Sequence, residues 1–432
     1  MESVAVTALD LELAQREREG SPVRVGLVGA GAMGQVIALQ LSGGVCGMRL
    51  AAVASRAPAR AEQVLQAAGV RAAVTDDVGR LCGAPEIDVL IEASGDVEFG
   101  AQVATQAIAG RKHLVLVNVE LDATVGPLLK ARADRAGVVI TGIDGDEPGV
   151  AMNLVRLVQT LGLRPVGAGN VKGFLDRFRT PATQQRFAEQ WGVRPWLATA
   201  AADGTKLSLE AAVLGNATGF KVGQRGMYGP QGAQVRDAVE RLPLDQLLNG
   251  GLVDYVLGAA PPAGAFVLAY EEHPLKRRWL SYLKLGEGPV YVLQTPYHLP
   301  HLQVALTVAR AVLDKDATVA PRGAPVCDVL TVAKQDLDAG TVLDGIGGFG
   351  CYGVIDNAEV VRGERLLPIG VARGCRLRRA ARRDEPIGYD DVDLPDGRLV
   401  DRLRAEQAAE FAMRVPAPAG SSTNSRRQEW TV

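Results

Sequence analysis

An acidic loop is the first feature of the sequence whose residue types could do chemistry. Residues 141–150 read TGIDGDEPGV, which places Asp144, Asp146 and Glu147 close together among glycines and a proline. Carboxylates stabilise the N-terminus of a helix, and we expect a helix to start near Gly149. Carboxylate oxygens also bind hard divalent cations such as Mg²⁺ or Mn²⁺. Both roles stay open, and Asp146 and Glu147 are the predicted ligands if a metal is bound.

Two lysines in glycine-containing turns are candidates for stabilising negative charge. Lys172 lies in VGAGNVKG, and Lys206 follows the turn Asp203-Gly204. An ammonium group held in such a turn can stabilise an alkoxide or bind a phosphate. The competing interpretation is that both lysines are surface cations.

Polar residues inside apolar surroundings extend the set of candidate catalytic residues. The stretch LSLEAAVLGNATGF is apolar on one face, with Glu210 and Asn216 as polar insertions. Buried polar groups need hydrogen-bond partners, and a substrate hydroxyl or phosphate is one such partner. Tyr297 and His298, in TPYHLPH, are candidate donors to a phosphate or a carbonyl. His298 and His301 lack further nearby ligands, which argues against a histidine metal site.

A glycine-rich turn predicts a dinucleotide site near the start of the chain. VRVGLV (23–28) is typical of a buried strand, and Gln35–Leu41 of a helix. Between them the glycines have the spacing G-x-G-x-x-G, which allows a tight turn, a close approach to a pyrophosphate and close packing of helix on strand. The residues predicted to bind the cofactor here are Gly29, Ala30, Gly31, Ala32, Met33 and Gly34.

The ends of the following strands should border the same cofactor. Strands are expected at Arg49–Ala54, Val89–Ala93, His113–Val119 and Gly137–Thr141, with helices between them, which predicts a doubly wound parallel Rossmann sheet. The second strand is followed by Ser55 and Arg56, where sites for NAD usually place an acid. A hydroxyl and a guanidinium suit a 2′-phosphate, so NADP(H) is favoured. The alternative is that Arg56 is a solvated loop cation. The further cofactor-binding candidates are Ser55, Arg56, Ala93, Ser94, Gly95, Asn118 and Glu120.

The 432 residues are too many for one core, so we expect an α/β chain of several parts. After the Rossmann sheet we expect an α+β catalytic domain, then a small β-rich domain in which a run of arginines is balanced by acids. The predicted ranges are an N-terminal helix at 1–20, the Rossmann domain at 21–150, the catalytic domain at 151–325, the β-rich domain at 326–415 and a disordered tail at 416–432.

Composition excludes several classes of partner. Hydrophobic residues make up 47% and charged residues 22%, and the net charge is −2, so nothing indicates a nucleic-acid or membrane partner. The five cysteines are scattered without metal-binding spacing and are expected to be free thiols. We therefore expect a cytoplasmic protein with a small-molecule substrate.

Taken together, the motifs resemble those of a known family. The chain is similar to homoserine-dehydrogenase-like oxidoreductases with a C-terminal SAF domain, and among them to the second type of 1-deoxy-D-xylulose 5-phosphate reductoisomerase-like proteins. The motifs that carry this resemblance are VRVGLVGAGAMG, IDVLIEASG, GRKHLVLVNVE, GDEPG, GNATGF, GMYGP, GLVDYVLG, GPVYV, PYHL with LTVARAVL, VLTVAKQDLDAGTVLDGIG and LLPIGVARGC.

The resemblance implies an NADPH-dependent enzyme that acts on a polyhydroxylated carbonyl compound, in isoprenoid biosynthesis, and a homo-oligomer (dimer or tetramer). In the named activity a sugar phosphate is rearranged and then reduced by hydride transfer, with a divalent cation polarising adjacent oxygens. By matching motif, Asp146 and Glu147 would lie near the metal, Lys172 and Lys206 near an alkoxide or phosphate, and Tyr297 and His298 in the substrate site. Thr295 stands where the family is expected to carry an arginine, and an arginine would clamp a phosphate.

Two other functions stay open at this point. One is a divergent reductase or a dehydrogenase of the homoserine type on a non-phosphorylated substrate, although its relatives carry a lysine where this chain has Val119-Glu120. The other is a non-catalytic NADP-binding sensor, which would bind the cofactor without turnover.

Overall fold

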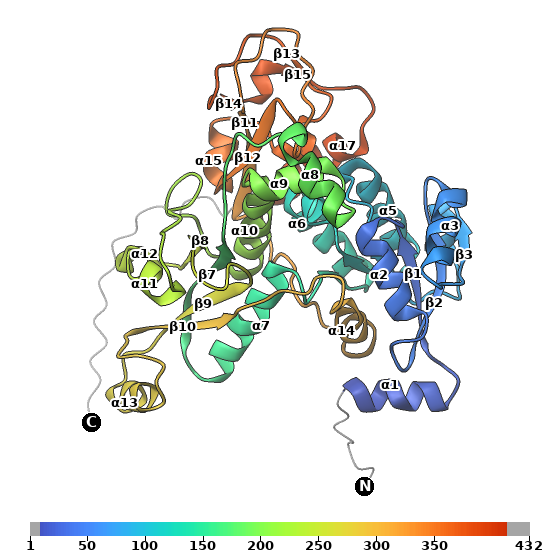
Figure 1. The fold of residues 1–432 in the computed structure, drawn as a ribbon, viewed down its shortest axis with the longest axis horizontal. Coiled ribbons are helices and arrows are strands. Elements are labelled where there is room, and N and C mark those ends of the chain that lie inside the picture. The colour runs from blue at the N-terminus through green and yellow to red at the C-terminus, as the bar shows by residue number, and fades with distance from the viewer. Residues whose placement is uncertain (1–8, 413–432) are drawn as a thin grey trace, which may run out of the picture.

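The computed structural model describes residues 9–412, which form three parts in space (Figure 1). The first part is a six-stranded parallel sheet with strand order β3-β2-β1-β4-β5-β6. This order is that of a doubly wound dinucleotide-binding sheet, so the predicted Rossmann fold is confirmed. The strands are β1 (Val23–Val28), β2 (Met48–Ala54), β3 (Ala73–Thr75), β4 (Val89–Glu92), β5 (His113–Leu116) and β6 (Ile140–Gly142).

Helices cover both faces of this sheet because each strand is followed by a crossover helix. They are α2 (Ala32–Leu41), α3 (Pro58–Ala67), α4 (Val78–Gly83), α5 (Val97–Ala109) and α6 (Val119–Ala136), preceded by α1 (Leu9–Arg18). The predicted strand at His113–Val119 was too long, since β5 ends at Leu116 and Val119 begins α6. The cause is local: the Asn118 side chain accepts a hydrogen bond from Leu121 N at 3.1 Å and caps the helix.

The second part is a mixed four-stranded sheet with order β10-β9-β7-β8. Its strands are β7 (Arg164–Lys172), β8 (Leu252–Leu257), β9 (Ala265–Tyr270) and β10 (Val290–Thr295). The long helix α10 lies between this sheet and the rest of the molecule (Figure 1). The helices are α7 (Glu147–Thr160), α8 (Pro181–Trp191), α9 (Pro195–Ala202), α10 (Thr205–Thr218), α11 (Val235–Val239), α12 (Leu244–Leu248) and α13 (Pro274–Tyr282).

The segment after β10 returns to the Rossmann sheet. The predicted helix at Val304–Leu313 is an α-helix, α14 (Val304–Ala309), that continues as a π-helix at Arg310–Asp314. Val304 and Val308 are fully buried in the same core as Val25 and Leu27 of β1. The chain therefore crosses from the second part back to the first before it enters the third.

The third part, which we call the C-terminal module, comprises residues 327–412. It contains one small three-stranded sheet, order β12-β11-β14, and a two-stranded pair, β13 with β15. Its helix α17 packs back on α5 and α6 of the first part. The elements are β11 (Cys327–Ala333), β12 (Cys351–Asn357), α15 (Ala358–Gly363), α16 (Ile369–Ala372), β13 (Arg376–Leu377), β14 (Pro386–Ile387), a 3₁₀ turn (Tyr389–Asp391), β15 (Val392–Asp393) and α17 (Leu399–Ala412).

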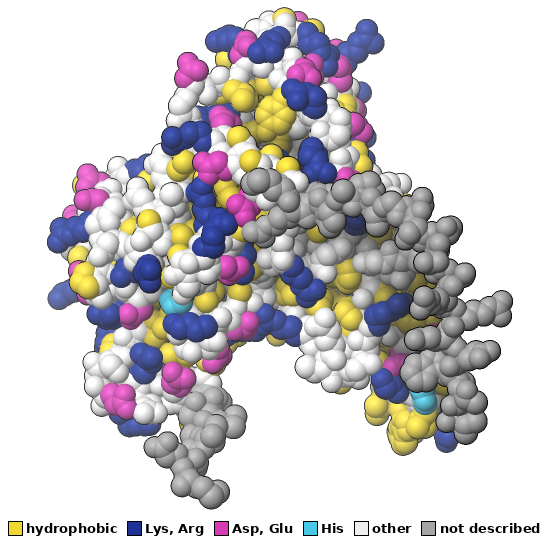
Figure 2. Space-filling view, turned by 180° about the vertical axis from the view of Figure 1, so that it is seen from behind, with side chains coloured by type: hydrophobic (Ala, Val, Ile, Leu, Met, Phe, Trp, Pro, Cys, Tyr) yellow, Lys and Arg dark blue, Asp and Glu magenta, His cyan; other side chains and the backbone are white. Residues whose placement is uncertain are grey.

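The surface is mixed in charge, as the net charge predicts. Seen from behind, Lys and Arg side chains alternate with Asp and Glu (Figure 2). Within the arginine run, Arg378 and Arg379 pair with the module's own acids, for example Arg379 with Glu385 and Asp391, both at 2.6 Å. No helix within residues 9–412 is both long enough and apolar enough to cross a membrane. The predicted disordered tail, 416–432, lies outside the described residues.

Candidate functional site

The glycine-rich turn between β1 and α2 has the shape of a dinucleotide cradle. Gly29 has φ +106°, and a Cβ there would lie 2.7 Å from the Ala93 carbonyl oxygen. A Cβ on Gly34 would collide with the Gly29 carbonyl, so this glycine permits the close approach of helix to strand. Gly31, by contrast, faces open space within 4 Å and stands at the start of α2 without a side-chain cap. The free N–H groups and the open space above Gly31 fit a pyrophosphate.

Several of the predicted strand-end residues lie beside this turn. Ser94 and Gly95 follow β4 directly, and Ser94 N lies 3.1 Å from the position of a Gly29 Cβ. Arg56 follows β2, lies over the Phe99 ring at 5.1 Å and places a guanidinium nitrogen 3.8 Å from Asp96 Oδ2. Ser55 Oγ accepts a hydrogen bond from Ala57 N at 3.2 Å, so its hydroxyl shapes the turn.

Glu92, at the end of β4, is a buried acid of this region that the sequence analysis missed. Its Oε1 accepts a hydrogen bond from Ser94 N at 2.9 Å, whereas its Oε2 has no hydrogen-bond partner among the described residues. Burial raises the pKa of Glu92 to about 7, although hydrogen bonding from Ser94 acts in the opposite direction. The only sequence signal was a glutamate that ends the apolar run VLIE.

The second group of predicted residues forms a buried cluster of opposite charges. Glu147 opens α7, Lys172 ends β7, and Lys206 and Glu210 lie one turn apart on α10. Lys172 Nζ lies 2.8 Å from Glu147 Oε1 and 3.3 Å from Glu210 Oε2. Lys206 Nζ lies 2.7 Å from Glu210 Oε1 and 3.6 Å from Asp146 Oδ1. We call Asp146, Glu147, Lys172, Lys206 and Glu210 the charge cluster.

Glu210 is the centre of the charge cluster and was noted in the sequence only as a polar insertion. Its side chain is fully buried, and it contacts both lysines. Asn170, two residues before Lys172 on β7, donates a hydrogen bond to Glu210 Oε2 at 2.7 Å. The available signal was the i, i+4 spacing of Lys206 and Glu210 on an otherwise apolar helix.

The strongly opposed charges shift the pKa values within the cluster. Burial raises the pKa of Asp146 well above its ordinary value, and Lys206 offsets this only in part. For Glu147, burial also acts upwards, but Lys172, then Lys206 and His298, lower its pKa well below the usual range. Burial would lower the pKa of Lys206, but Asp146 and Glu210 raise it well above its ordinary value. The two lysines therefore stay charged at neutral pH.

The loop before α14 brings a predicted histidine to the cluster. His298 Nε2 lies 3.6 Å from Glu147 Oε1. The loop is fixed against the acidic turn because Leu299 N donates a hydrogen bond to the Gly145 carbonyl at 3.0 Å. The neighbouring Tyr297 is 54% exposed, so its side chain lies at the solvent side of this loop.

Glu120 connects the two groups of residues. It lies in the first turn of α6, at the edge of the Rossmann crevice, and is buried. Burial raises its pKa, while the Lys206 ammonium lowers it and Glu210 raises it further. A residue predicted to border the cofactor is therefore within electrostatic reach of the charge cluster.

The structure does not bring Asn216 to this cluster. It lies six residues beyond Glu210 on α10, about 9 Å along the helix axis. Its Oδ1 accepts hydrogen bonds from Val326 N at 2.7 Å and Cys327 N at 3.0 Å. Its amide therefore holds the start of β11, which is a structural role.

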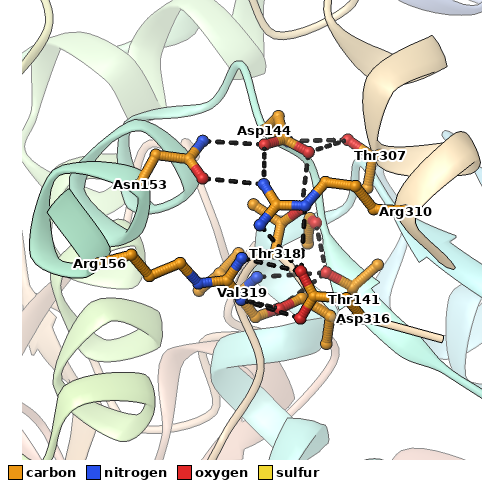
Figure 3. Close-up of polar contacts among 11 residues, drawn as sticks. Thr141, Asp144, Asn153, Arg156, Thr307, Arg310, Asp316, Thr318 and Val319 are labelled. Carbon is orange, nitrogen blue, oxygen red and sulfur yellow. Dashed lines mark hydrogen bonds and ion pairs between the residues drawn. The ribbon is translucent and has the colours of Figure 1, made fainter. Parts of the chain in front are cut away.

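Asp144, the first acid of the loop, makes its hydrogen bonds to residues outside the cluster (Figure 3). Its Oδ1 accepts hydrogen bonds from Asn153 and Arg310, each at 2.8 Å. Its Oδ2 accepts from Thr307 at 3.0 Å and Thr318 at 2.6 Å. Asp144 thus fixes the loop, while Asp146 stands at the N-cap position of α7 without a side-chain capping bond.

The carboxylates of the charge cluster fit a divalent cation. Asp146, Glu147 and Glu210 each offer an oxygen within 4.8 Å of the others. Glu147 Oε2 is buried and has no hydrogen-bond partner among the described residues, so it is an acceptor in need of a positive partner. Oxygen donors of this kind suit Mg²⁺ or Mn²⁺.

Comparison with protein-family models matches two segments of the chain. Residues 23–117 match a model described as oxidoreductase family, NAD-binding Rossmann fold. Residues 145–304 match a model described as oxidoreductase DRL, catalytic domain. Neither description names a homoserine dehydrogenase or a SAF domain, so these narrower parts of the resemblance stay predictions. A search of the curated proteins finds no match.

Solved structures also resemble the chain, at low similarity. A myo-inositol dehydrogenase from Lactobacillus casei is 15% identical over 70% of this chain and 88% of its own, with a TM-score of 0.38. A scyllo-inositol dehydrogenase from the same organism is 12% identical over 68% and 90%, with a TM-score of 0.37. An NAD-binding oxidoreductase from Klebsiella pneumoniae is 24% identical over 35% of this chain and 43% of its own, with a TM-score of 0.28. Scores this low support no conclusion about substrate.

The two matched models, with the glycine cradle, assign the chain to a class of enzyme. It is an oxidoreductase that uses a nicotinamide cofactor. The segment that matches the catalytic model contains all five residues of the charge cluster as well as His298.

Proposed function

We propose that this oxidoreductase is an NADPH-dependent reductase of a small polyhydroxylated carbonyl compound. The observation that carries the proposal is the charge cluster, in which carboxylates and ammonium groups alternate within 3.6 Å of one another. Such a set offers acceptors for hydroxyl hydrogens and donors for hydroxyl or carbonyl oxygens side by side. An apolar substrate would cover these charged groups without offering them any hydrogen bond, at a desolvation cost.

Reduction of a carbonyl group adds a hydride to carbon and a proton to oxygen, and the bound cofactor supplies the hydride. Negative charge then develops on the oxygen. Lys172 and Lys206, both held charged by the acids around them, stabilise that oxygen, and an ammonium proton can complete the alcohol. Glu210 and Asn170 hold the two lysines in place, and preorganised charges need not reorganise during the reaction.

The narrower proposal is a reductoisomerase, which rearranges 1-deoxy-D-xylulose 5-phosphate before reduction. Asp146, Glu147 and Glu210 would hold Mg²⁺ or Mn²⁺, which supplies Lewis-acid polarisation of adjacent substrate oxygens. Tyr297 and His298 would complete the substrate site from the loop before α14. The lack of an arginine at Thr295 favours a non-phosphorylated substrate as the second candidate.

The test follows NADPH absorbance with the full chain and either 1-deoxy-D-xylulose 5-phosphate or its unphosphorylated analogue, with and without Mg²⁺ or Mn²⁺. Oxidation of NADPH that needs both the metal and the phosphate supports the reductoisomerase. Metal-independent oxidation with the unphosphorylated compound supports the second candidate. If neither compound, nor a panel of other polyhydroxylated carbonyl compounds, is reduced while NADPH still binds, the proposed substrate class is wrong.

A further inference from the structure

Arg373 of the C-terminal module differs from the neighbouring arginines because its ion-pair partner lies in another part of the protein. Arg378 and Arg379 pair with acids of the module itself, at 2.8 and 2.6 Å. Arg376 donates a hydrogen bond to the Gly340 carbonyl, also within the module. Arg373, between α16 and β13, instead places a guanidinium nitrogen 3.7 Å from Asp96 Oδ2 in the Rossmann part. Arg373 therefore brings a positive charge from the module to the loop that follows β4.

The acid that Arg373 meets lies at a defined place in that loop. Asp96 follows β4 and caps α5, since its Oδ1 accepts a hydrogen bond from Phe99 N at 2.9 Å. Arg56 follows β2. Because β2 and β4 flank β1 and its glycine turn, the loops after these strands lie on either side of that turn, and the loop after β2 is the one that meets the adenosine ribose of a dinucleotide bound there.

Arg56 and Arg373 converge on the same oxygen atom. Their nitrogens lie 3.8 and 3.7 Å from Asp96 Oδ2, so the two nitrogens are separated by at most the sum of these distances, about 7.5 Å. A phosphate that accepts charge-assisted hydrogen bonds of about 2.8 Å on two of its oxygens bridges nitrogens up to roughly 8 Å apart. The two guanidinium groups are therefore close enough for one phosphate to contact both.

The local charge also suits a phosphate. Two guanidinium groups and one carboxylate leave a net charge of +1 at this spot. The side chains of Arg56 and Arg373 are 56% and 79% exposed, so both can turn towards a ligand from their present contacts, which are longer than hydrogen bonds.

We propose that Arg373 and Arg56 together bind the 2′-phosphate of NADPH, so that the C-terminal module completes the cofactor site and contributes to cofactor choice. This inference rests on the proposed preference for NADPH. It assigns a ligand-binding role to a residue more than 250 positions beyond the Rossmann segment, 23–117, that matches a family model. Trp196 of α9, in the second part, lies between the Rossmann part and the module: a Cβ on Gly95 would lie 3.5 Å from its ring, and a Cβ on Gly347 of the C-terminal module would collide with its carbonyl oxygen.

The test measures binding of NADPH and NADH to the full chain by quenching of protein fluorescence, for the wild type and three variants. In Arg373→Ala and Arg56→Ala we expect the dissociation constant for NADPH to rise about tenfold and that for NADH to stay within twofold. The matched control, Arg376→Ala, removes an exposed guanidinium of the same module and should change neither constant. Competition by 2′-AMP should weaken in Arg373→Ala, while competition by 5′-AMP and by inorganic phosphate should not. This comparison separates binding of the 2′-phosphate from phosphate binding in general.

Three results would overturn the inference, and only the third also overturns the proposed NADPH dependence. If the wild type prefers NADPH but Arg373→Ala binds it normally, the clamp is wrong and the preference lies elsewhere. If Arg373→Ala weakens NADH and NADPH equally, the arginine acts on folding or on the whole crevice. If the wild type shows no preference for NADPH, both the clamp and the proposed NADPH dependence fail, although reductase activity with NADH would keep the proposed chemistry.

Discussion

Asp122 provides the sharpest test of the burial that the structure assigns to α6. It lies in the first turn of α6 and is 4% exposed. Within residues 9–412 no donor hydrogen bonds to its carboxylate, and burial alone raises its pKa to about 7. We therefore consider the substitution Asp122→Asn, which has the shape of the protonated acid and stays neutral at every pH.

The sign and size of the effect follow from linkage between proton binding and folding. The pKa of this carboxyl is about 7 in the folded protein, against an ordinary value of 3.8 in the unfolded chain. The folded state thus holds a proton that the unfolded chain releases, so the wild type loses stability as pH rises from about 4 to about 7. The loss reaches roughly 4 kcal/mol above pH 8, because a difference of one pH unit between the two pKa values corresponds to about 1.4 kcal/mol. The variant avoids this loss.

The assay is urea unfolding followed by circular dichroism between pH 4.5 and 8.5. We expect the free energy of unfolding of Asp122→Asn to exceed that of the wild type by a gap that widens by about 1.4 kcal/mol per pH unit near pH 6 and levels off above pH 8. A pH-independent gap for Asp122→Asn would refute the reasoning, since the carboxyl would then be ionised or solvated in the folded state.

Three further predictions concern the cofactor turn, the charge cluster and the C-terminal module. A Cβ at Gly31 meets no protein atom within 4 Å, so Gly31→Val should keep the melting temperature but abolish cofactor binding, and normal NADPH affinity would contradict the cradle. A Cβ at Gly34 collides with backbone, so Gly34→Ala should also lower stability by about 1–3 kcal/mol. Lys206→Met should reduce turnover at least a hundredfold while cofactor affinity stays within twofold, and wild-type turnover would remove this lysine from the site. Lys334→Met should lower the free energy of unfolding by about 3–5 kcal/mol, because Asp203 then stays buried without its 2.8 Å partner; a loss under 1 kcal/mol in urea unfolding would show that the pair is solvated.

The sequence predicted the strand, the glycine turn and the helix of the candidate cofactor site because their determinants are local. A strand, three glycines and a helix follow one another within twenty residues, and each glycine's role depends on atoms nearby in the fold. Gly31 is the clearest case, since the sequence predicted a close approach of ligand and the structure leaves open space there. The excess length of the predicted strand at His113–Val119 has a local cause too, namely the cap formed by Asn118.

The charge cluster could be predicted only in part because its members come from distant elements. The acidic loop was found, but the sequence could not divide its acids between structure and site. That division depends on Thr307, Arg310 and Thr318, which lie more than 160 positions away and bind Asp144. Glu210 was visible as a polar insertion in a predicted apolar stretch. Its partner Lys172 lies at the end of strand β7, far from α10 in sequence, so the central place of Glu210 could not be inferred from spacing.

The C-terminal module contacts both parts of the protein that carry the candidate site. Lys334 of the module, almost fully buried, donates hydrogen bonds at 2.8 Å to Asp203, to the Arg179 carbonyl and to the Gly348 carbonyl. Asp203 in turn accepts a hydrogen bond from Thr205 N at the start of α10, one residue before Lys206.

On the other side, α17 of the module is fixed to the Rossmann part. Glu98 of α5 accepts hydrogen bonds from Leu399 N and Val400 N at 2.8 and 2.9 Å. One module therefore holds both the helix that carries Lys206 and the helix that follows the cofactor crevice. Because hydride transfer requires donor and acceptor within about 3–3.5 Å, a rigid connection of this kind has a direct consequence for rate. A change in the module that leaves both halves folded should therefore affect turnover more than the binding of either cofactor or substrate alone.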